Sequence, residues 1–142
     1  LADKPVAVFT GNRFYRQQPT PGPGGESTHQ QISAVSALGR EYVGVSARRA
    51  PLLVADPIDT VLRARVAVPR DLRVESLPRD ASLDTPFGRY QRRVRLDGAT
   101  IVVERQLSVP LQRVVPQNYQ AFVRFASAID AHDAETAVLN RR

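Results

Sequence analysis

The sequence predicts a mainly β protein, an antiparallel β-sandwich of immunoglobulin-like type with one C-terminal α-helix packed on it. Three observations lead to this prediction. Hydrophobic and charged residues alternate with a period of two over residues 58–68, an Asp97-Gly98 pair separates two strand-like runs, and apolar residues after Pro116 recur at helical spacing. Strands and helices of this kind are stable only when their apolar side is buried against another layer.

The composition is that of one globular domain, and it excludes several kinds of chemistry. The chain has 142 residues, 42% hydrophobic and 24% charged, which suffices for a core without metal or disulfide support. The absence of cysteine excludes thiol catalysis and cysteine metal sites within this chain. No apolar run reaches the ~18 residues that cross a bilayer. No signal peptide is visible, and a chain beginning at Leu1 is expected to be a processed product or an excised fragment.

The positive charge is spread along the chain. The formal charge is +6, and Lys4 is the one lysine among 20 basic residues. Segments 1–50, 51–110 and 111–142 hold six, ten and four bases against three, eight and three acids. Nucleic-acid binders usually gather their bases on one face, often with aromatic residues that stack on the nucleobases. Binding of nucleic acid or another anionic surface is therefore the alternative function and not the leading one.

Residues 1–47 are predicted to be an N-terminal β segment. The Val- and Phe-rich run 5–10 favours a strand, and residues 11–18 favour a turn with a partner strand. Residues 19–31 are rich in proline and glycine, which predicts a flexible loop.

Ser27 and His29 lie within this loop, where a nucleophile and its base would lack the rigid geometry that catalysis needs. The next run, 32–38, favours a strand or a short helical turn ending at Gly39. Residues 41–45 favour another short strand.

Residues 48–142 are predicted to be the β-sandwich domain, forming one compact unit with the N-terminal segment. In the strand over 58–68, charged residues face outward and apolar residues share the other face. The apolar set is Ile58, Leu62, Ala64, Val66 and Val68. Residues 72–78 repeat the alternation, and residues 79–88 are expected to be a connection.

The arginines of the next hairpin divide between two faces. An Asp97-Gly98 turn, the strongest short-range hairpin signal, places Arg93 and Arg95 on a solvated face near Glu104.

Two other arginines of the hairpin fall on its apolar face. The same turn pairs Arg92 with Val103 and Tyr90 with Arg105. Buried guanidinium groups need partners, and we expect stacking on Tyr90 or an ion pair with an acid such as Asp84.

The C-terminal helix is predicted over 116–131, with Pro116 at its first position. Its apolar side holds Tyr119, Phe122, Val123, Ala126 and Ile129. Its wetter side holds Gln117, Gln120, Arg124, Asp130 and Asp133. A last short strand is predicted over 137–139.

No group of residues predicts a catalytic, metal or cofactor site. The two histidines, His29 and His132, are far apart and neither has a second ligand at metal-binding spacing. Carboxylates mostly adjoin an arginine, as Glu104 adjoins Arg105, which predicts solvated pairs of about 0–1 kcal/mol. Residues 132–135 are expected to be exposed polar residues at the helix end.

The order of short motifs over roughly 48–140 resembles one family. It is the C-terminal β-rich domain, of uncharacterised function, that follows the transglutaminase-like core in bacterial transglutaminase-like proteins. That family shows a strand ending in proline, a Leu-Pro turn, a Phe-Gly-x-Tyr hairpin and a P-x-x-Y-x-x-F-x-x-F helix. The matching positions are Pro51, Leu52, Leu77, Pro78, Phe87, Gly88, Tyr90, Arg105, Pro116, Tyr119, Phe122 and Phe125.

The resemblance implies a β-sandwich accessory module without catalytic residues of its own, because the family's Cys-His-Asp set belongs to the preceding core. It also implies an extracytoplasmic location. The expected partner is another protein or the adjacent catalytic domain of the same parent chain. We therefore expect a non-catalytic interaction module that needs no cofactor.

Overall fold

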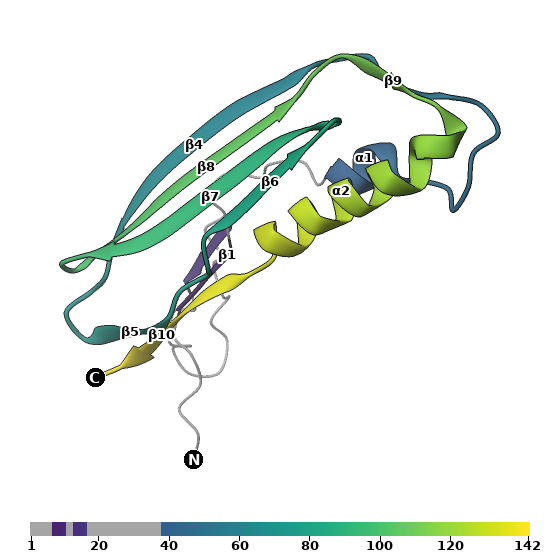
Figure 1. Cartoon of the computed structure of the whole chain (residues 1–142). Coiled ribbons are helices and arrows are strands. Elements are labelled where there is room, and N and C mark those ends of the chain that lie inside the picture. Colours follow the sequence, from purple (N-terminus) through teal and green to yellow (C-terminus); the bar gives the residue numbers. More distant parts are fainter. Residues whose placement is uncertain (1–6, 11–12, 17–37) are drawn as a thin grey trace.

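The upper layer of the fold is a four-stranded antiparallel sheet with the order β4-β8-β7-β6 (Figure 1). The computed structural model describes residues 7–10, 13–16 and 38–142. The four strands are β4 (Ile58–Ala67), β6 (Ala81–Thr85), β7 (Gly88–Asp97) and β8 (Thr100–Val109). Along β4 the predicted apolar residues are half-buried and the charged ones exposed, so the predicted alternation is confirmed.

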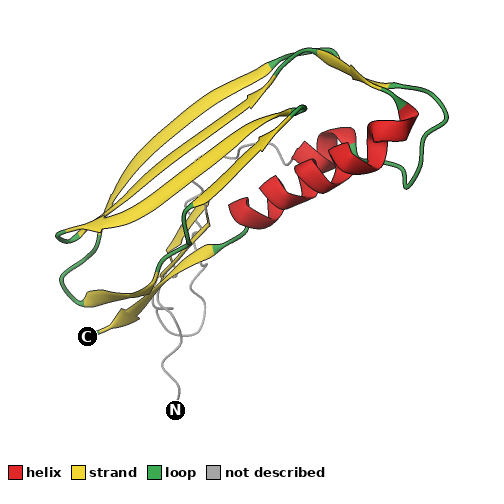
Figure 2. Ribbon diagram, viewed as in Figure 1, coloured by secondary structure: helices red, strands yellow, loops and turns green. Residues whose placement is uncertain are grey.

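The lower layer is a helix followed directly by a small sheet. The 3-10 turn η1 (Pro116–Asn118) leads into α2 (Tyr119–Asp133), and β10 (Thr136–Arg141) follows. β10 pairs with β5 (Leu72–Ser76) and with β1 (Ala7–Thr10), which pairs with β2 (Arg13–Arg16). Figure 2 shows α2 beneath one half of the large sheet and the small sheet continuing beneath the other half. The fold is therefore mainly β, antiparallel and sandwich-like, with a C-terminal helix packed on it, as predicted.

A two-stranded ribbon and a short helix complete the helical end of the molecule. β3 (Leu52–Val54) and β9 (Gln112–Val114) form a two-stranded ribbon. The helix α1 (Leu38–Tyr42) lies beside α2. The two carboxylate oxygens of Asp130 on α2 accept hydrogen bonds from the first two backbone N–H groups of α1, at 3.1 and 2.9 Å. α2 thus satisfies donors that a helix start leaves without intrahelical partners.

Two hydrophobic clusters lie between the layers. The first lies between α2 and the large sheet and contains Phe122, Phe125 and Ile129 of the helix. The second joins the hairpin end of the large sheet to the small sheet and contains Leu72, Ile101, Val103, Ala137 and Leu139. Phe122 is completely buried, and burial of such a side chain contributes roughly 1.5–3 kcal/mol. The predicted apolar side of the helix is confirmed, with Phe125 added to it.

Several local predictions are wrong, for physical reasons that the structure shows. Residues 79–88 were expected to be a connection but contain the strand β6. Every residue of β6 pairs with a residue of β7. Residues 41–45 form no strand, and α1 includes Gly39 instead of ending there, because Asp130 caps its start. The predicted strands around 5–10 and 11–18 are confirmed as β1 and β2. The predicted loop over 19–31 and all but Leu38 of the predicted run 32–38 lie outside the described residues, and a domain division after residue 47 stays a prediction.

The hairpin turn lies one residue further along than predicted. Asp97 pairs with Thr100, so the two-residue loop is Gly98-Ala99, with Gly98 at φ 59°. Positive φ at the first loop position suits glycine and matches the twist of the strands. Each cross-strand pair of the hairpin therefore shifts by two residues. Such a shift keeps every side chain on its predicted face.

No helix among the described residues is long and apolar enough to span a membrane. Within the same residues, no three histidine or carboxylate side chains gather as a metal site would need.

Candidate functional site

Two buried arginines lie side by side where the lower layer changes from helix to strand. Arg92 of β7 and Arg105 of β8 are direct cross-strand partners, and 0% and 2% of their surfaces are exposed. The predicted turn placed Val103 opposite Arg92, so this pairing is a correction. Like charges facing each other are unfavourable, and buried charges require counter-charges. The C-terminal end of α2 supplies them.

Asp133, the last residue of α2, is the counter-charge of Arg105. Nε and Nη2 of Arg105 donate to the two carboxylate oxygens at 2.8 and 2.7 Å, and the Tyr90 hydroxyl donates to the same carboxylate at 2.8 Å. The guanidinium also lies 5.4 Å from the centroid of the Tyr90 ring. The predicted stacking on Tyr90 is confirmed. The predicted acid was wrong, because Asp84 binds Arg89 on the surface at 3.2 Å.

Arg92 closes the end of α2 and the turn that follows it. Its guanidinium donates to the backbone carbonyls of His132 and Arg79, and its Nη2 lies 2.9 Å from the carboxylate of Glu135. The last carbonyls of a helix lack intrahelical donors, and the negative end of the helix dipole attracts cations. The other oxygen of Glu135 is 3.0 Å from Nδ1 of His132. One arginine therefore ties the helix end to the segment just before β6.

The pKa values of Tyr90, Arg105 and Glu135 in this ion cluster are shifted. Burial, followed by the nearby charge of Asp133, raises the pKa of Tyr90. Burial alone would lower the pKa of Arg105, but its hydrogen bonds and charge pairing with Asp133 outweigh burial and raise it. The hydrogen bond with His132 lowers the pKa of Glu135, with Arg92 adding to the effect against partial burial. The observed hydrogen bonds require a neutral phenol at Tyr90, a charged guanidinium at Arg105 and a charged carboxylate at Glu135. These shifts favour a structural role.

The prediction that the helix end is exposed is therefore wrong at Asp133, of which 7% is exposed. The pairing of Glu104 with Arg105 is also wrong, because adjacent residues of β8 point to opposite faces. A signal for Asp133 was present in the sequence. It lies four positions after Ile129 and seven after Ala126, where the apolar side of the helix returns.

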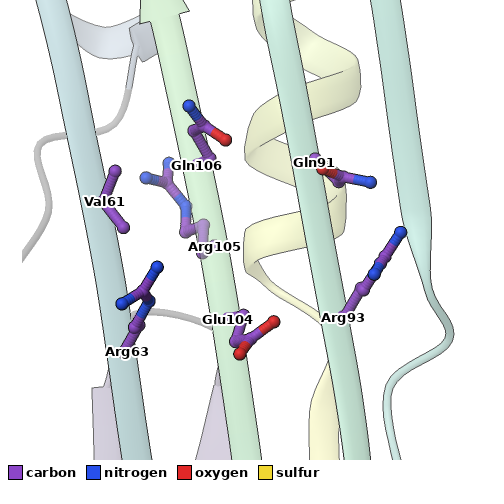
Figure 3. Close-up of a pocket in the computed structure, with 7 residues that line it drawn as sticks. All are labelled: Val61, Arg63, Gln91, Arg93, Glu104, Arg105 and Gln106. Atoms are coloured by element: carbon purple, nitrogen blue, oxygen red, sulfur yellow. The ribbon is translucent and has the colours of Figure 1, made fainter.

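The face of the large sheet that points away from α2 is polar (Figure 3). Two cross-strand rows, Val61–Gln106–Gln91 and Arg63–Glu104–Arg93, line a shallow hollow of about 140 Å³. Arg93 and Arg95 are exposed, as predicted. Of the residues that the structure describes, arginines and the carboxylate of Glu104 line the hollow, and no aromatic side chain does. Its chemistry is that of a solvated surface.

The β3–β9 ribbon presents apolar side chains to solvent. Leu52 and Val54 of β3 and Val114 of β9 are buried. The opposite face carries Leu53, which pairs with Arg113. Leu111 and Val115 lie two residues to either side of Arg113. The exposed fractions of Leu53, Leu111 and Val115 are 61%, 62% and 40%.

The sequence also matches a known family over most of its length. Residues 31–139 match a domain of unknown function with a solved structure, DUF3858. The chain belongs to this family. No curated protein matches the sequence of this DUF3858 member.

A solved structure shares the fold of this DUF3858 member. It comes from Parabacteroides distasonis and is described as a "putative protease". The TM-score is 0.61 and the sequence identity 17%, over 77% of this chain and 22% of that chain. The similarity concerns the fold alone, and this chain spans about a fifth of the length of that protein.

The Phe-Gly-x-Tyr motif has a structural explanation in this DUF3858 member. Phe87 packs edge-to-face on Phe122, with ring centroids 5.5 Å apart. A Cβ at Gly88 would lie 2.4 Å from the backbone carbonyl oxygen of Ser108, so the strand approach there requires glycine. Tyr90 binds the buried Asp133. The motif therefore builds the contact between β7 and α2.

Proposed function

We propose that this chain is a non-catalytic accessory module that supports protein–protein contacts and docks on an adjacent catalytic domain of its parent protein. The outer face of the β3–β9 ribbon is the observation that carries this proposal. Single exposed apolar side chains are common on protein surfaces. Here Leu53 pairs with Arg113 on one short ribbon, and the exposed Leu111 and Val115 lie just before and just after the strand that carries Arg113. The buried core of a protein interface is more apolar than the rest of the surface, and arginine is enriched there.

Three further observations support a module without its own chemistry. The chain has no cysteine, so it cannot supply the nucleophile of the Cys-His-Asp set that the transglutaminase-like resemblance implies. Its buried charges, Arg92, Arg105 and Asp133, are used to join α2 to the large sheet. In the Parabacteroides protein the same fold occupies 22% of a longer chain. An extracytoplasmic location is part of this proposal and rests on the resemblance.

Binding measurements with ribbon variants test the docking surface. The double variant Leu53→Asp/Leu111→Asp would be titrated calorimetrically against the remainder of the parent protein, expressed separately. We expect at least a tenfold loss of affinity with an unchanged melting temperature, because both side chains are already exposed. Val61→Asp is the matched control, because Val61 is 60% exposed but lies on the large sheet. Equal binding by the wild-type and ribbon-variant chains would refute the docking surface, and peptide hydrolysis or acyl transfer by the purified chain would refute the non-catalytic role.

The alternative function is binding of nucleic acid or another anionic surface through the polar face of the large sheet. The exposed arginines on β4 and β7 favour it. The carboxylates among them and the lack of aromatic side chains in the hollow count against it. A gel-shift series at low and physiological salt distinguishes the two functions. Phosphate binding predicts an affinity that falls steeply as salt rises.

A further inference from the structure

A cleft opens between the two layers at the hairpin end of the molecule. It has a volume of about 530 Å³ and lies between the β7–β8 loop, the β4–β5 connection and β5. Figure 1 shows the hairpin end and β5 on the same side of the fold, near the C-terminal end of β10. Its apolar lining includes Val68, Leu72, Val74 and Leu96. The volume is within the roughly 300–1,000 Å³ typical of small-molecule sites.

The cleft exists because the inner face of β7 extends beyond its cover. Tyr90 and Arg92 are 1% and 0% exposed beneath the helix end. Val94 is half-buried against the small sheet. Leu96, the next inward residue, is 48% exposed and borders the cleft. An apolar surface that the lower layer covers elsewhere is therefore open to solvent at this end.

The charged groups around the cleft have one sign. Arg70, Arg73 and Arg142 line it, and no carboxylate side chain from the described part of the chain does. Nε of Arg142 donates to a backbone carbonyl of β5 at 3.2 Å. Among the described residues, no carboxylate lies within ion-pair distance of these three guanidinium groups.

The nearest acids along the chain are otherwise engaged or do not line the cleft. Asp97 at the hairpin end is 3.3 Å from Arg65. Glu75 accepts a hydrogen bond from Asn140 at 2.7 Å. Asp71 is exposed and contributes its backbone carbonyl, which accepts a hydrogen bond from the Arg142 N–H at 2.9 Å.

We propose that this cleft binds an aliphatic carboxylate, with the hydrocarbon chain between the layers and the carboxylate at the arginines. The apolar lining would bury methylene groups, each contributing roughly 0.8 kcal/mol when fully buried. The guanidinium forks match the geometry of a carboxylate. An uncharged alkyl chain would leave the arginines without a counter-charge. A short carboxylate would leave Leu96 exposed. The proposal is independent of docking through the ribbon, which lies at the other end of the large sheet.

Titration of the isotope-labelled 142-residue chain, followed by its amide NMR signals, tests the site. The probe is decanoate below its micelle concentration, compared with decanol, butyrate and a decyl ammonium salt. We expect saturable shifts for residues 68–74 and 96–99 with decanoate and much weaker binding of the other three probes.

Variants with unchanged circular dichroism spectra assign the roles of charge and apolar surface. Arg70→Gln, in the turn before β5, should weaken decanoate binding roughly two- to fivefold, and Leu96→Asp should weaken it further. Arg95→Gln changes a residue on the opposite face of β7 from Leu96. It should leave the affinity unchanged. Decanol binding as tight as decanoate, shifts centred elsewhere, or unchanged affinity in both cleft variants would overturn the proposal. Binding to anionic lipid vesicles without binding of monomeric decanoate would also overturn it.

Discussion

Replacing Arg105 by leucine should destabilise the fold far more than it alters any surface. The side chain is 2% exposed, so its loss changes little that a partner could contact. It leaves Asp133, itself 7% exposed, with the Tyr90 hydroxyl as its one remaining side-chain partner among the described residues. Removing one member of a buried ion pair costs about 3–5 kcal/mol, because the remaining charge is desolvated without compensation.

Other contributions are smaller and partly cancel. Loss of the stacking on the buried Tyr90 adds about 2 kcal/mol. Relief of the repulsion between Arg92 and its cross-strand partner acts in the opposite direction. A net cost of about 3–5 kcal/mol is a large part of the roughly 5–15 kcal/mol that stabilises a typical domain.

Urea denaturation followed by circular dichroism measures this cost. Arg95→Leu on the exposed face is the matched control and should change the free energy of unfolding by less than about 0.5 kcal/mol. The double variant Arg105→Leu/Asp133→Leu should recover most of the loss, because an apolar pair of suitable size often replaces a buried ion pair without cost. The reasoning is refuted if Arg105→Leu costs less than about 1 kcal/mol or if the double variant is no more stable than the single one.

Two further predictions concern Gly88, the first residue of β7, and Glu135, which lies just after the C-terminal end of α2. Gly88→Ala should cost about 1–3 kcal/mol in urea denaturation, because its Cβ would lie 2.4 Å from a backbone oxygen. Gly44→Ala, whose Cβ meets nothing within 4 Å, is the control that should stay near wild type. The pKa of Glu135 is lowered from 4.5, so its stabilising charge is fully present above about pH 4.5 and is lost as the pH falls through the lower folded-state value. Glu135→Gln should therefore reduce the fall in melting temperature below about pH 4.5 while costing at most about 1 kcal/mol at pH 7. An identical acid profile in both proteins would contradict this assignment.

Periodicity predicted the elements whose apolar face is continuous. β4 and α2 each have a single buried side that repeats at the strand or helix period, so the fold class followed from them. The short strand β6 was missed because it contains Asp84 and because Ala81 and Leu83 are the only apolar residues among its inward-facing positions. Its pairing with β7 depends on contacts that no local pattern records.

The ion cluster of Arg92, Arg105, Asp133 and Glu135 was only half predictable. The hairpin pattern placed Arg92 and Arg105 on the inner face, which implied buried partners. Asp133 is the last residue of α2 and Glu135 lies two residues beyond it, so both are far from the hairpin in sequence. Choosing them required the position of the helix end relative to the sheet. The cleft and the ribbon face were not predictable, because they depend on where one layer stops covering the other.

The buried pair Arg92 and Arg105 also limits which alternative hairpin pairings can compete with the native one. Burial of apolar residues does not distinguish pairings that differ by two residues, because the same side chains face inward in each. The Asp97-Gly98 turn, which local sequence favours, belongs to one such competitor. Only in the observed pairing are Arg92 and Arg105 level with each other, so that the acids at one helix end can serve both. The cluster thus raises the energy of a near-native alternative and widens the gap that makes a single folded state dominant.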